Sequence, residues 1–222
     1  MPRSCIESDK LAWNEGFLTY PKARIGIDVS SYQEDIDWEA VAEAGVEFAI
    51  VRVGYRGYGE EGTLNEDTYY LENILGAQQA GLTVGVYLFS QALNIDEAME
   101  EAAFLLDRID GLDIDGPVVF DWERVTSSSS SRSKNVNKKT LTECAAVFCE
   151  MVKHSGYEPY IYFNQTLAYG SLALDELTDY GWWLAEYNDD PNFYYNCQMW
   201  QYSDSGSVPG ISGRRTDLDL WF

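Results

Sequence analysis

The sequence predicts an α/β fold, a single incomplete (β/α) barrel with about eight strands, the last of which lack intervening helices. Two observations and one physical argument predict this fold. Apolar, β-branched segments alternate with helical patterns, which indicates parallel βαβ units. The chain has 222 residues, which suffices for one large barrel, and no break in it favours two domains. Closure into a barrel also hides the strand edges that an open sheet exposes.

The first part of the chain contains the most regular alternation. Residues 1–23 have no periodic pattern and are predicted to be an N-terminal leader or extension of the domain that residues 24–222 form. Bounded runs of apolar and β-branched residues predict strands at 24–30, 48–53 and 83–89. Helical periodicity predicts helices at 36–44, 66–80 and 95–109. Asp37 is the expected cap and Gly45 the expected stop of the first helix, and a loop rich in Gly and Tyr is expected at 54–59.

The second part starts with the same alternation and then loses its helices. A strand at 117–123, a helix at 138–154 and a strand at 159–163 continue the pattern. The serine tract at 127–133, interrupted by Arg132, predicts a flexible surface loop. The remaining predictions are a short helical connection at 175–178 and strands at 181–187, 197–202 and 217–222 joined by loops.

Carboxylates mark the ends of several of these strands. Asp121 and Glu123 close the buried strand 117–123 and share one of its faces, because strand side chains alternate. Asp28 ends the first strand. Asp217 begins the last one, and barrel closure places it beside Asp28 if that strand runs antiparallel. Four acids then surround one mouth of the barrel, on the side where parallel βα barrels place their active sites.

Each acid also has an ordinary structural explanation. An isolated Asp at a strand end is more often a turn or cap residue. Ion pairs with Arg52 or Arg124 would account for Asp121 and Glu123. Crowding favours function, because neighbouring like charges raise at least one pKa and leave a proton available for general-acid catalysis. Acids beside aromatic rings are what glycosidic bond cleavage requires.

Composition argues against several other functions. The 37 acidic and 15 basic residues give a formal net charge of −22, which repels nucleic acid and anionic lipid surfaces. The four cysteines form no CxxC pair and the chain has a single histidine, so the sequence argues against a zinc site. Asn188, Asp189 and Asp190 lack the glycine and distal Glu of a calcium loop. We therefore expect no metal and no cofactor. No apolar run is long enough to span a bilayer, so membrane insertion is not expected.

Five segments, in this order, resemble glycoside hydrolase family 25, the Chalaropsis-type lysozymes. They are 26–33 (GIDVSSYQ), 119–123 (VFDWE), 183–187 (WLAEY), 200–202 (WQY) and 216–219 (TDLD). The resemblance implies a flattened barrel, with residues 24–222 as the catalytic domain. It also implies hydrolysis of the β-1,4 bond between N-acetylmuramic acid and N-acetylglucosamine in peptidoglycan.

The resemblance also implies roles for individual residues. Glu123 matches the general acid, Asp121 a carboxylate that positions or stabilises the substrate acetamido group, and Asp28 and Asp217 the two further acids of the site. The residues expected to bind substrate are Tyr55, Tyr87, Tyr162, Trp183, Glu186 and Gln201. For each aromatic residue, core or rim packing is an equally good explanation. Two departures from the family are the long connection at the serine tract and the negative charge of Glu186, where relatives carry Gln, His or another polar residue.

These inferences define the expected partners and the alternatives. The expected partner is the glycan strand of peptidoglycan, with no nucleic acid and no membrane insertion, and the protein is expected to be a monomer. An extracellular or cell-wall location is expected, although this chain shows no signal peptide. Two alternatives stay open, a non-catalytic cell-wall glycan-binding module and a chitin-type glycosidase.

Overall fold

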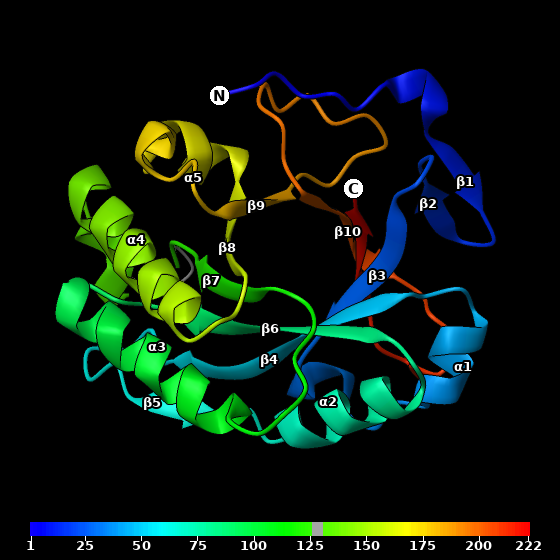
Figure 1. Cartoon of the computed structure of the whole chain (residues 1–222), viewed down its shortest axis with the longest axis horizontal. Helices are drawn as coiled ribbons and strands as arrows, with labels where there is room; N and C mark the ends of the chain where they lie inside the picture. The colour runs from blue at the N-terminus through cyan, green and yellow to red at the C-terminus, as the bar shows by residue number, and fades with distance from the viewer. Residues whose placement is uncertain (126–130) are drawn as a thin grey trace.

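Eight strands close into a barrel in the computed structural model, which describes residues 1–125 and 131–222 (Figure 1). Around the barrel they are β3 (Arg24–Val29), β4 (Phe48–Arg56), β6 (Thr83–Ser90), β7 (Val118–Trp122), β8 (Pro159–Asn164), β9 (Gly181–Ala185), β10 (Met199–Gly206) and β11 (Thr216–Trp221). Pairing of β11 with β3, and of β3 with β4, closes the sheet. The predicted eight-stranded α/β barrel is confirmed.

The strand directions place one set of strand ends on a common rim. Strands β3 to β10 run parallel along the barrel wall, whereas β11 is antiparallel to both of its neighbours, β10 and β3. The carboxyl ends of the parallel strands and the amino end of β11 therefore lie at the same end of the barrel.

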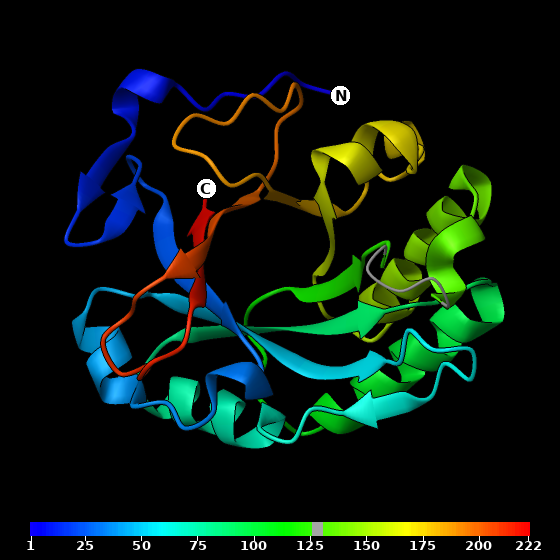
Figure 2. The same ribbon diagram turned by 180° about the vertical axis from the view of Figure 1, so that it is seen from behind.

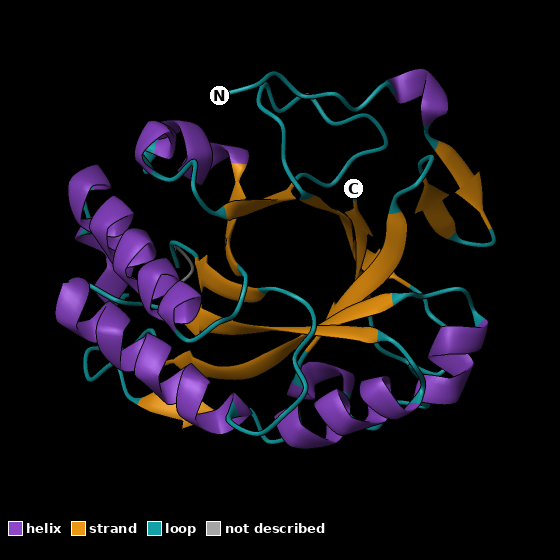
Figure 3. Cartoon of the chain, in the orientation of Figure 1, coloured by secondary structure: helices purple, strands orange, loops and turns teal. Residues whose placement is uncertain are grey.

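Helices cover the outer wall over only part of the ring (Figure 3). They are α1 (Trp38–Glu43), α2 (Tyr70–Gln79), α3 (Ile95–Ile109), α4 (Lys138–His154) and α5 (Gln165–Gly170). The predicted bounds of α3 and α4 are confirmed to the residue, and the Asp37 side chain caps α1 by accepting the Ala40 N–H. Loops alone join β9 to β10 and β10 to β11, as predicted. Among the described helices, none combines the length and apolar character that a bilayer span requires.

Two apolar layers result from the alternation of side chains along the strands. Outward residues such as Val118, Phe120 and Trp122 join the large core beneath the helices. Inward residues form a second cluster inside the barrel, with Phe48, Ile50, Val119, Tyr160, Tyr162, Trp183, Ala185 and Met199 as its buried members. A Cβ at Gly26 would lie 2.2 Å from the Phe48 ring, so this inward position requires glycine. The inward cluster fills the barrel below the rim acids.

Several local predictions are wrong. The loop expected at 54–59 is in part strand, because β4 continues to Arg56 and pairs with β5 (Leu64–Glu66). The helix expected at 66–80 consequently begins only at Tyr70. Helix α5 was not predicted, and the short helical connection is a 3-10 turn, η4 (Leu174–Glu176).

The described part of the serine tract, residues 131–133, is not the surface loop that the sequence predicts. Residues 127–130 of the tract lie outside the described residues. Ser131 and Ser133 are buried, and the side chain of Arg132 is buried in an ion pair with Glu97. Residues 132–135 form a 3-10 turn, η3 (Arg132–Asn135). The last part of the tract is therefore packed against the domain and is not a surface loop.

Residues 1–23 pack against the barrel through a 3-10 turn and a hairpin. The turn is η1 (Ser8–Lys10), and the hairpin strands are β1 (Ala12–Asn14) and β2 (Phe17–Thr19). Phe17 and Leu18 are buried, and the Leu18 N–H donates to the Tyr202 hydroxyl at 3.1 Å. Figures 1 and 2 both show the N-terminus beside the loop between β9 and β10, where the Ser4 N–H donates to the Tyr194 carbonyl. The boundary at residue 23 stays a prediction.

Candidate active site

Four carboxylates meet at the rim where the parallel strands end. Asp28 is near the end of β3, Asp121 lies in β7, and Glu123 immediately follows β7. Asp217, at the start of β11, pairs in register with Asp28 across the antiparallel ladder. The expected meeting of the first and last strands is confirmed, and it depends on the antiparallel direction of β11.

These acids line a cavity of about 230 Å³. Its walls are formed by Asp28, Arg52, Tyr87, Phe89, Asp121, Glu123, Tyr162, Trp183, Tyr187, Gln201, Asp204 and Asp217. A second cavity of about 280 Å³ shares Asp28, Arg52, Tyr87, Asp204 and Asp217 with it, so the two form one continuous depression. A larger groove of about 740 Å³ lies on the outside between α1 and α2 and contains none of the four acids. We therefore place the site at the rim and not in the larger groove.

A glutamine connects the acids to the aromatic wall. The Gln201 side-chain amide donates to Asp28 Oδ2 at 2.6 Å, and its oxygen accepts the hydroxyls of Tyr162 at 2.8 Å and Tyr187 at 3.0 Å. Trp183 packs edge-on against Tyr162, with 4.9 Å between ring centroids. Hydrogen bonds on both ends of the amide fix its orientation. The wall is thus a connected set of aromatic and amide groups, of the kind that binds sugars.

Burial and crowding raise the pKa values of the β7 acids. Burial is the main cause for both Asp121 and Glu123. For Asp121 the negative charges of Glu123 and Asp28 raise the pKa further, and the positive charge of Arg52 offsets part of the increase. Asp121 is 5% exposed, whereas Glu123 is only partly buried at the end of the strand. Of the two, Glu123 is more accessible to a substrate while its proton is held more tightly than in water.

The paired acids of β3 and β11 are also perturbed. Burial first, and then the charge of Asp28, raises the pKa of Asp217 to about 9. Burial and the neighbouring Asp219 raise the pKa of Asp28 well above its usual range. Carboxylates this close cannot all be ionised at neutral pH. The cavity therefore holds protons at neutral pH.

The ion pairs that offered an ordinary explanation for the β7 acids are made elsewhere. Arg52 pairs with Asp67, with 2.7 Å between Nη2 and Oδ2. Arg124 donates to the backbone carbonyls of Ser133, Lys134 and Val136 at 2.7–3.0 Å. Asp121 Oδ1 is buried with no hydrogen-bond partner among the described residues. A structural ion pair therefore does not explain the acids at the end of β7.

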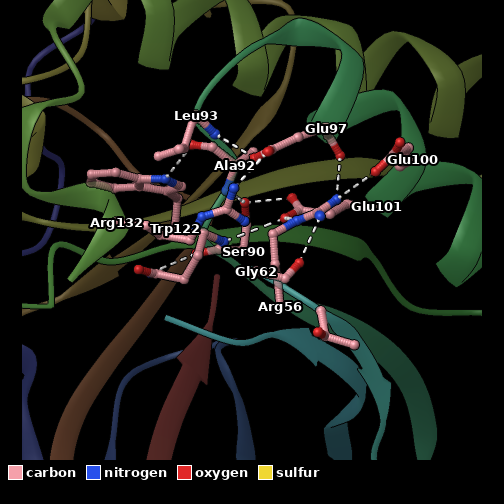
Figure 4. Close-up of polar contacts among 12 residues, drawn as sticks. Arg56, Gly62, Ser90, Ala92, Leu93, Glu97, Glu100, Glu101, Trp122 and Arg132 are labelled. Carbon is pink, nitrogen blue, oxygen red and sulfur yellow. Dashed lines mark hydrogen bonds and ion pairs between the residues drawn. The ribbon is translucent and has the colours of Figure 1, made fainter. Parts of the chain in front are cut away.

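A buried polar network supports β7 from outside the barrel (Figure 4). Glu101 of α3 accepts hydrogen bonds from Arg56 Nε at 2.7 Å and from the Ser90 hydroxyl at 2.5 Å. Gln91, which immediately follows β6, is fully buried and its side-chain amide donates to the Glu123 carbonyl at 2.6 Å. The Trp122 indole N–H donates to the Ala92 carbonyl at 3.1 Å. These bonds fix the backbone that carries Glu123.

Eight of the ten predicted site residues line the cavity, and two do not. Those in the cavity are Asp28, Tyr87, Asp121, Glu123, Tyr162, Trp183, Gln201 and Asp217. Tyr55 follows a register shift in β4 and packs beneath the Arg52 guanidinium, with 5.3 Å to the ring centroid. Glu186 accepts the backbone N–H groups of Asn192 and Phe193 at 3.0 and 3.2 Å and so holds the loop between β9 and β10. In this structure Tyr55 and Glu186 lie outside the cavity wall.

Sequence reasoning did not assign four further cavity residues to the site. Arg52 could have been found from its inward alternation with Ile50, and Tyr187 lies within a motif already noted. Phe89 and Asp204 carry no comparable signal. A further acid, Asp219, lies fully buried beneath the cavity. Among the described residues, no cluster of three or more His, Cys, Asp or Glu is arranged to hold a metal ion.

Comparison with known proteins identifies the family. The sequence model of the family described as glycosyl hydrolases family 25 matches residues 27–211, which is most of the chain. The chain belongs to this family. An autolytic lysozyme of Clostridium acetobutylicum is 33% identical over 196 residues, which cover 87% of this chain and 54% of that protein.

Solved structures of family 25 relatives share the fold. The modular autolysin LytC of Streptococcus pneumoniae superposes with a TM-score of 0.77 at 27% identity, over 96% of this chain and 52% of that one. A family 25 glycosyl hydrolase of Bacillus anthracis superposes with a TM-score of 0.74 at 24% identity, over 90% and 88% of the two chains. The chain spans about half the length of the clostridial and pneumococcal relatives.

Proposed function

We propose that this family 25 protein is a peptidoglycan hydrolase, a lysozyme that cleaves the β-1,4 bond between N-acetylmuramic acid and N-acetylglucosamine. The observation that carries the proposal is the Asp121 and Glu123 pair at the end of β7, inside an aromatic cavity that also holds Asp28 and Asp217. The names of the relatives support it. One is an autolytic lysozyme, and the LytC structure has also been solved with a synthetic peptidoglycan ligand.

Glu123 is the general acid in this proposal. Its raised pKa keeps the carboxyl protonated at mildly acidic pH, and its position at the strand end lets a sugar approach. The Glu123 proton passes to the oxygen of the leaving sugar as its bond to C1 breaks. Water then supplies a hydroxyl to C1 and a proton to the enzyme, so the net reaction consumes one water molecule.

Asp121 positions or stabilises the substrate acetamido group. It lies one alternation before Glu123 on the inward face of β7 and is almost fully buried, so its side chain has little freedom. Burial and the charges of Glu123 and Asp28 raise its pKa, and the charge of Arg52 offsets only part of the increase. The mechanism requires an ionised Asp121 beside a protonated Glu123, so that one carboxyl stabilises positive charge while the other donates a proton.

The remaining cavity groups bind the glycan strand. Tyr87, Tyr162 and Trp183 offer ring faces and edges to sugar rings. Gln201 connects the hydroxyls of Tyr162 and Tyr187 with Asp28. Tyr55 and Glu186 shape the rim indirectly, through Arg52 and through the loop between β9 and β10. We propose that the protein acts as a monomer on the cell wall, outside the membrane.

Product analysis tests this function. The protein is incubated with purified peptidoglycan and, separately, with oligomers of N-acetylglucosamine, and the products are reduced and identified by mass spectrometry. We expect fragments with N-acetylmuramic acid at the reducing end. Reducing N-acetylglucosamine ends, or cleavage of the chitin oligomers alone, would indicate a different glycosidase. Binding without new reducing ends would indicate a glycan-binding module.

A further inference from the structure

Asp219 is a buried acid that lies outside both cavities. It follows Asp217 by two residues on β11, so the two side chains share the inward face of the barrel. Asp217 borders the cavity, but Asp219 lies deeper in the barrel and is 0% exposed. Because an ionised carboxylate is costly to bury without partners, its hydrogen bonds need to be accounted for.

One oxygen of Asp219 has a strong partner and the other has none. Oδ1 accepts the indole N–H of Trp183 at 2.8 Å, which places the acid directly behind the cavity wall. Oδ2 is buried and has no hydrogen-bond partner among the described residues. An unpaired buried acceptor is destabilising, so a donor is expected beside it.

The strand register places Asp28 at the right position to be that donor. Asp219 pairs with Gly26, two residues before Asp28 on the same inward face of β3. Gly26 has no side chain to separate the two acids, and diagonal neighbours on an antiparallel ladder are within reach of each other. Two ionised carboxylates cannot form a hydrogen bond, because neither carries a proton. A bond between Asp28 and Asp219 therefore requires a proton.

We propose that Asp219 is a positioning residue of the active site, which accepts one hydrogen bond from the Trp183 indole and one from a protonated Asp28. The role of Asp219 in an active site rests on the proposed function, but its two hydrogen bonds do not depend on that function. Asp219 then carries the negative charge of the pair, beneath the cavity. Asp28 is neutral where it borders the substrate.

As a consequence, Asp219 holds two parts of the site in place, the Trp183 indole and the Asp28 carboxyl. Trp183 packs against Tyr162 and Tyr87, with centroid distances of 4.9 and 6.4 Å, so its indole orientation sets the aromatic wall. Asp28 is also held by the Gln201 amide. Burial raises the pKa values of both acids, and hydrogen bonding between them raises that of Asp28 further but offsets part of the increase for Asp219, which favours the proton on Asp28.

Other titratable groups surround this pair and are included in the test. The Asp28 carboxyl faces or interacts with Asp217 on β11, Arg52 on β4, Tyr87 on β6, Asp121 on β7 and Tyr187 after β9. Asp219 interacts with Asp217 and with Tyr202 on β10. Asp219→Asn leaves all of these in place. It keeps an acceptor for Trp183 and replaces the acceptor for Asp28 with an N–H donor.

The experiment is a carboxyl-carbon NMR titration of Asp28, assigned by the loss of its signal in Asp28→Asn. In Asp219→Asn the amide favours ionised Asp28, so its titration midpoint is expected to fall by more than about one pH unit. The surface variant Asp179→Asn also removes one negative charge and controls for net charge. A midpoint that is the same in wild type and Asp219→Asn overturns the proposal. No substrate is present, so this result is independent of the proposed function.

Kinetics and the indole signal test the contact with Trp183. Asp219→Leu removes both acceptors, so the Trp183 indole N–H resonance is expected to shift, and KM for a soluble glycan to rise about tenfold. In Asp219→Asn the indole signal and KM are expected to stay close to wild type. Equal KM values and equal indole signals in wild type, Asp219→Asn and Asp219→Leu would contradict the proposal that Asp219 positions Trp183. If Asp219→Leu does not fold, the titration of Asp219→Asn still decides.

Discussion

Asp217 of β11 lies directly opposite Asp28 of β3 in an antiparallel ladder, so the first and last barrel strands bring two acids together at one rim. In a barrel whose strands were all parallel, the start of the last strand would lie at the opposite end. The reversed direction of β11 therefore places Asp217 at the site. The close pairing has an energetic cost, because burial and the charge of Asp28 raise the pKa of Asp217 to about 9.

This cost predicts a pH-dependent stability. A carboxyl with a raised pKa binds its proton more tightly in the folded state, so its stabilising contribution is complete below the unfolded pKa and is lost as the pH rises toward about 9. At about pH 8, Asp217→Asn is expected to raise the Tm by about 2–4 °C or more, and near pH 3.5 to leave it almost unchanged. Thermal unfolding with Asp179→Asn as a surface control measures the effect. Equal Tm values at pH 8 would contradict the raised pKa.

The activity of the wild type is expected to follow a bell-shaped pH profile. Burial raises the pKa of Glu123, which keeps the acid protonated into mildly acidic solution, while a second carboxyl has to be ionised. The rate of release of reducing ends from purified peptidoglycan should therefore be highest at mildly acidic pH and fall on both sides. A constant rate from neutral to alkaline pH would exclude a carboxyl as the proton donor.

The buried polar network that supports β7 from outside the barrel predicts that a substitution of Arg56, which does not border the cavity, strongly lowers stability. Arg56 pairs with Glu101, whose side chain is 0% exposed. Arg56→Met leaves the Glu101 carboxylate uncompensated and is expected to cost about 3–5 kcal/mol in the free energy of unfolding. The double variant Arg56→Met/Glu101→Gln should recover part of this loss. Denaturant unfolding measures both, and a single variant as stable as wild type would contradict the buried ion pair.

Salt is expected to help the protein act on intact walls. The formal net charge of −22 repels wall polymers that are themselves anionic. Raising the ionic strength from low to physiological shortens the Debye length to about 8 Å, which should increase the rate on whole walls. A soluble, uncharged glycan serves as the control substrate and should show little change. A rate on walls that falls with added salt would indicate attraction instead.

The sequence predicted the barrel and the four rim acids because both follow from local patterns. Strand alternation places Asp121 and Glu123 on one face, and the long periodic segments of α3 and α4 leave little ambiguity. No local pattern in the sequence predicts the contacts between segments that are distant along the chain. The register shift in β4 moves Tyr55 away from the cavity, and the hydrogen bonds of Glu186 depend on the conformation of its own loop.

The same limit applies to burial across the barrel. Arg56 was assigned to a loop because the glycines around it resemble a turn, and the structure instead pairs it with Glu101 of a distant helix. Asp219 was noted only as part of a motif. Its hydrogen bond to Trp183 joins two strands that are not neighbours in the barrel, and such a contact requires coordinates to be seen.

The most direct test of the proposed mechanism is the rate at which Glu123→Gln releases reducing ends from purified peptidoglycan, compared with wild type. Glutamine keeps the size of the side chain but has no acidic proton. The rate is expected to fall at least about 100-fold while the Tm stays close to that of wild type. The surface variant Glu176→Gln should retain wild-type activity. Wild-type activity in Glu123→Gln would contradict its assignment as the general acid.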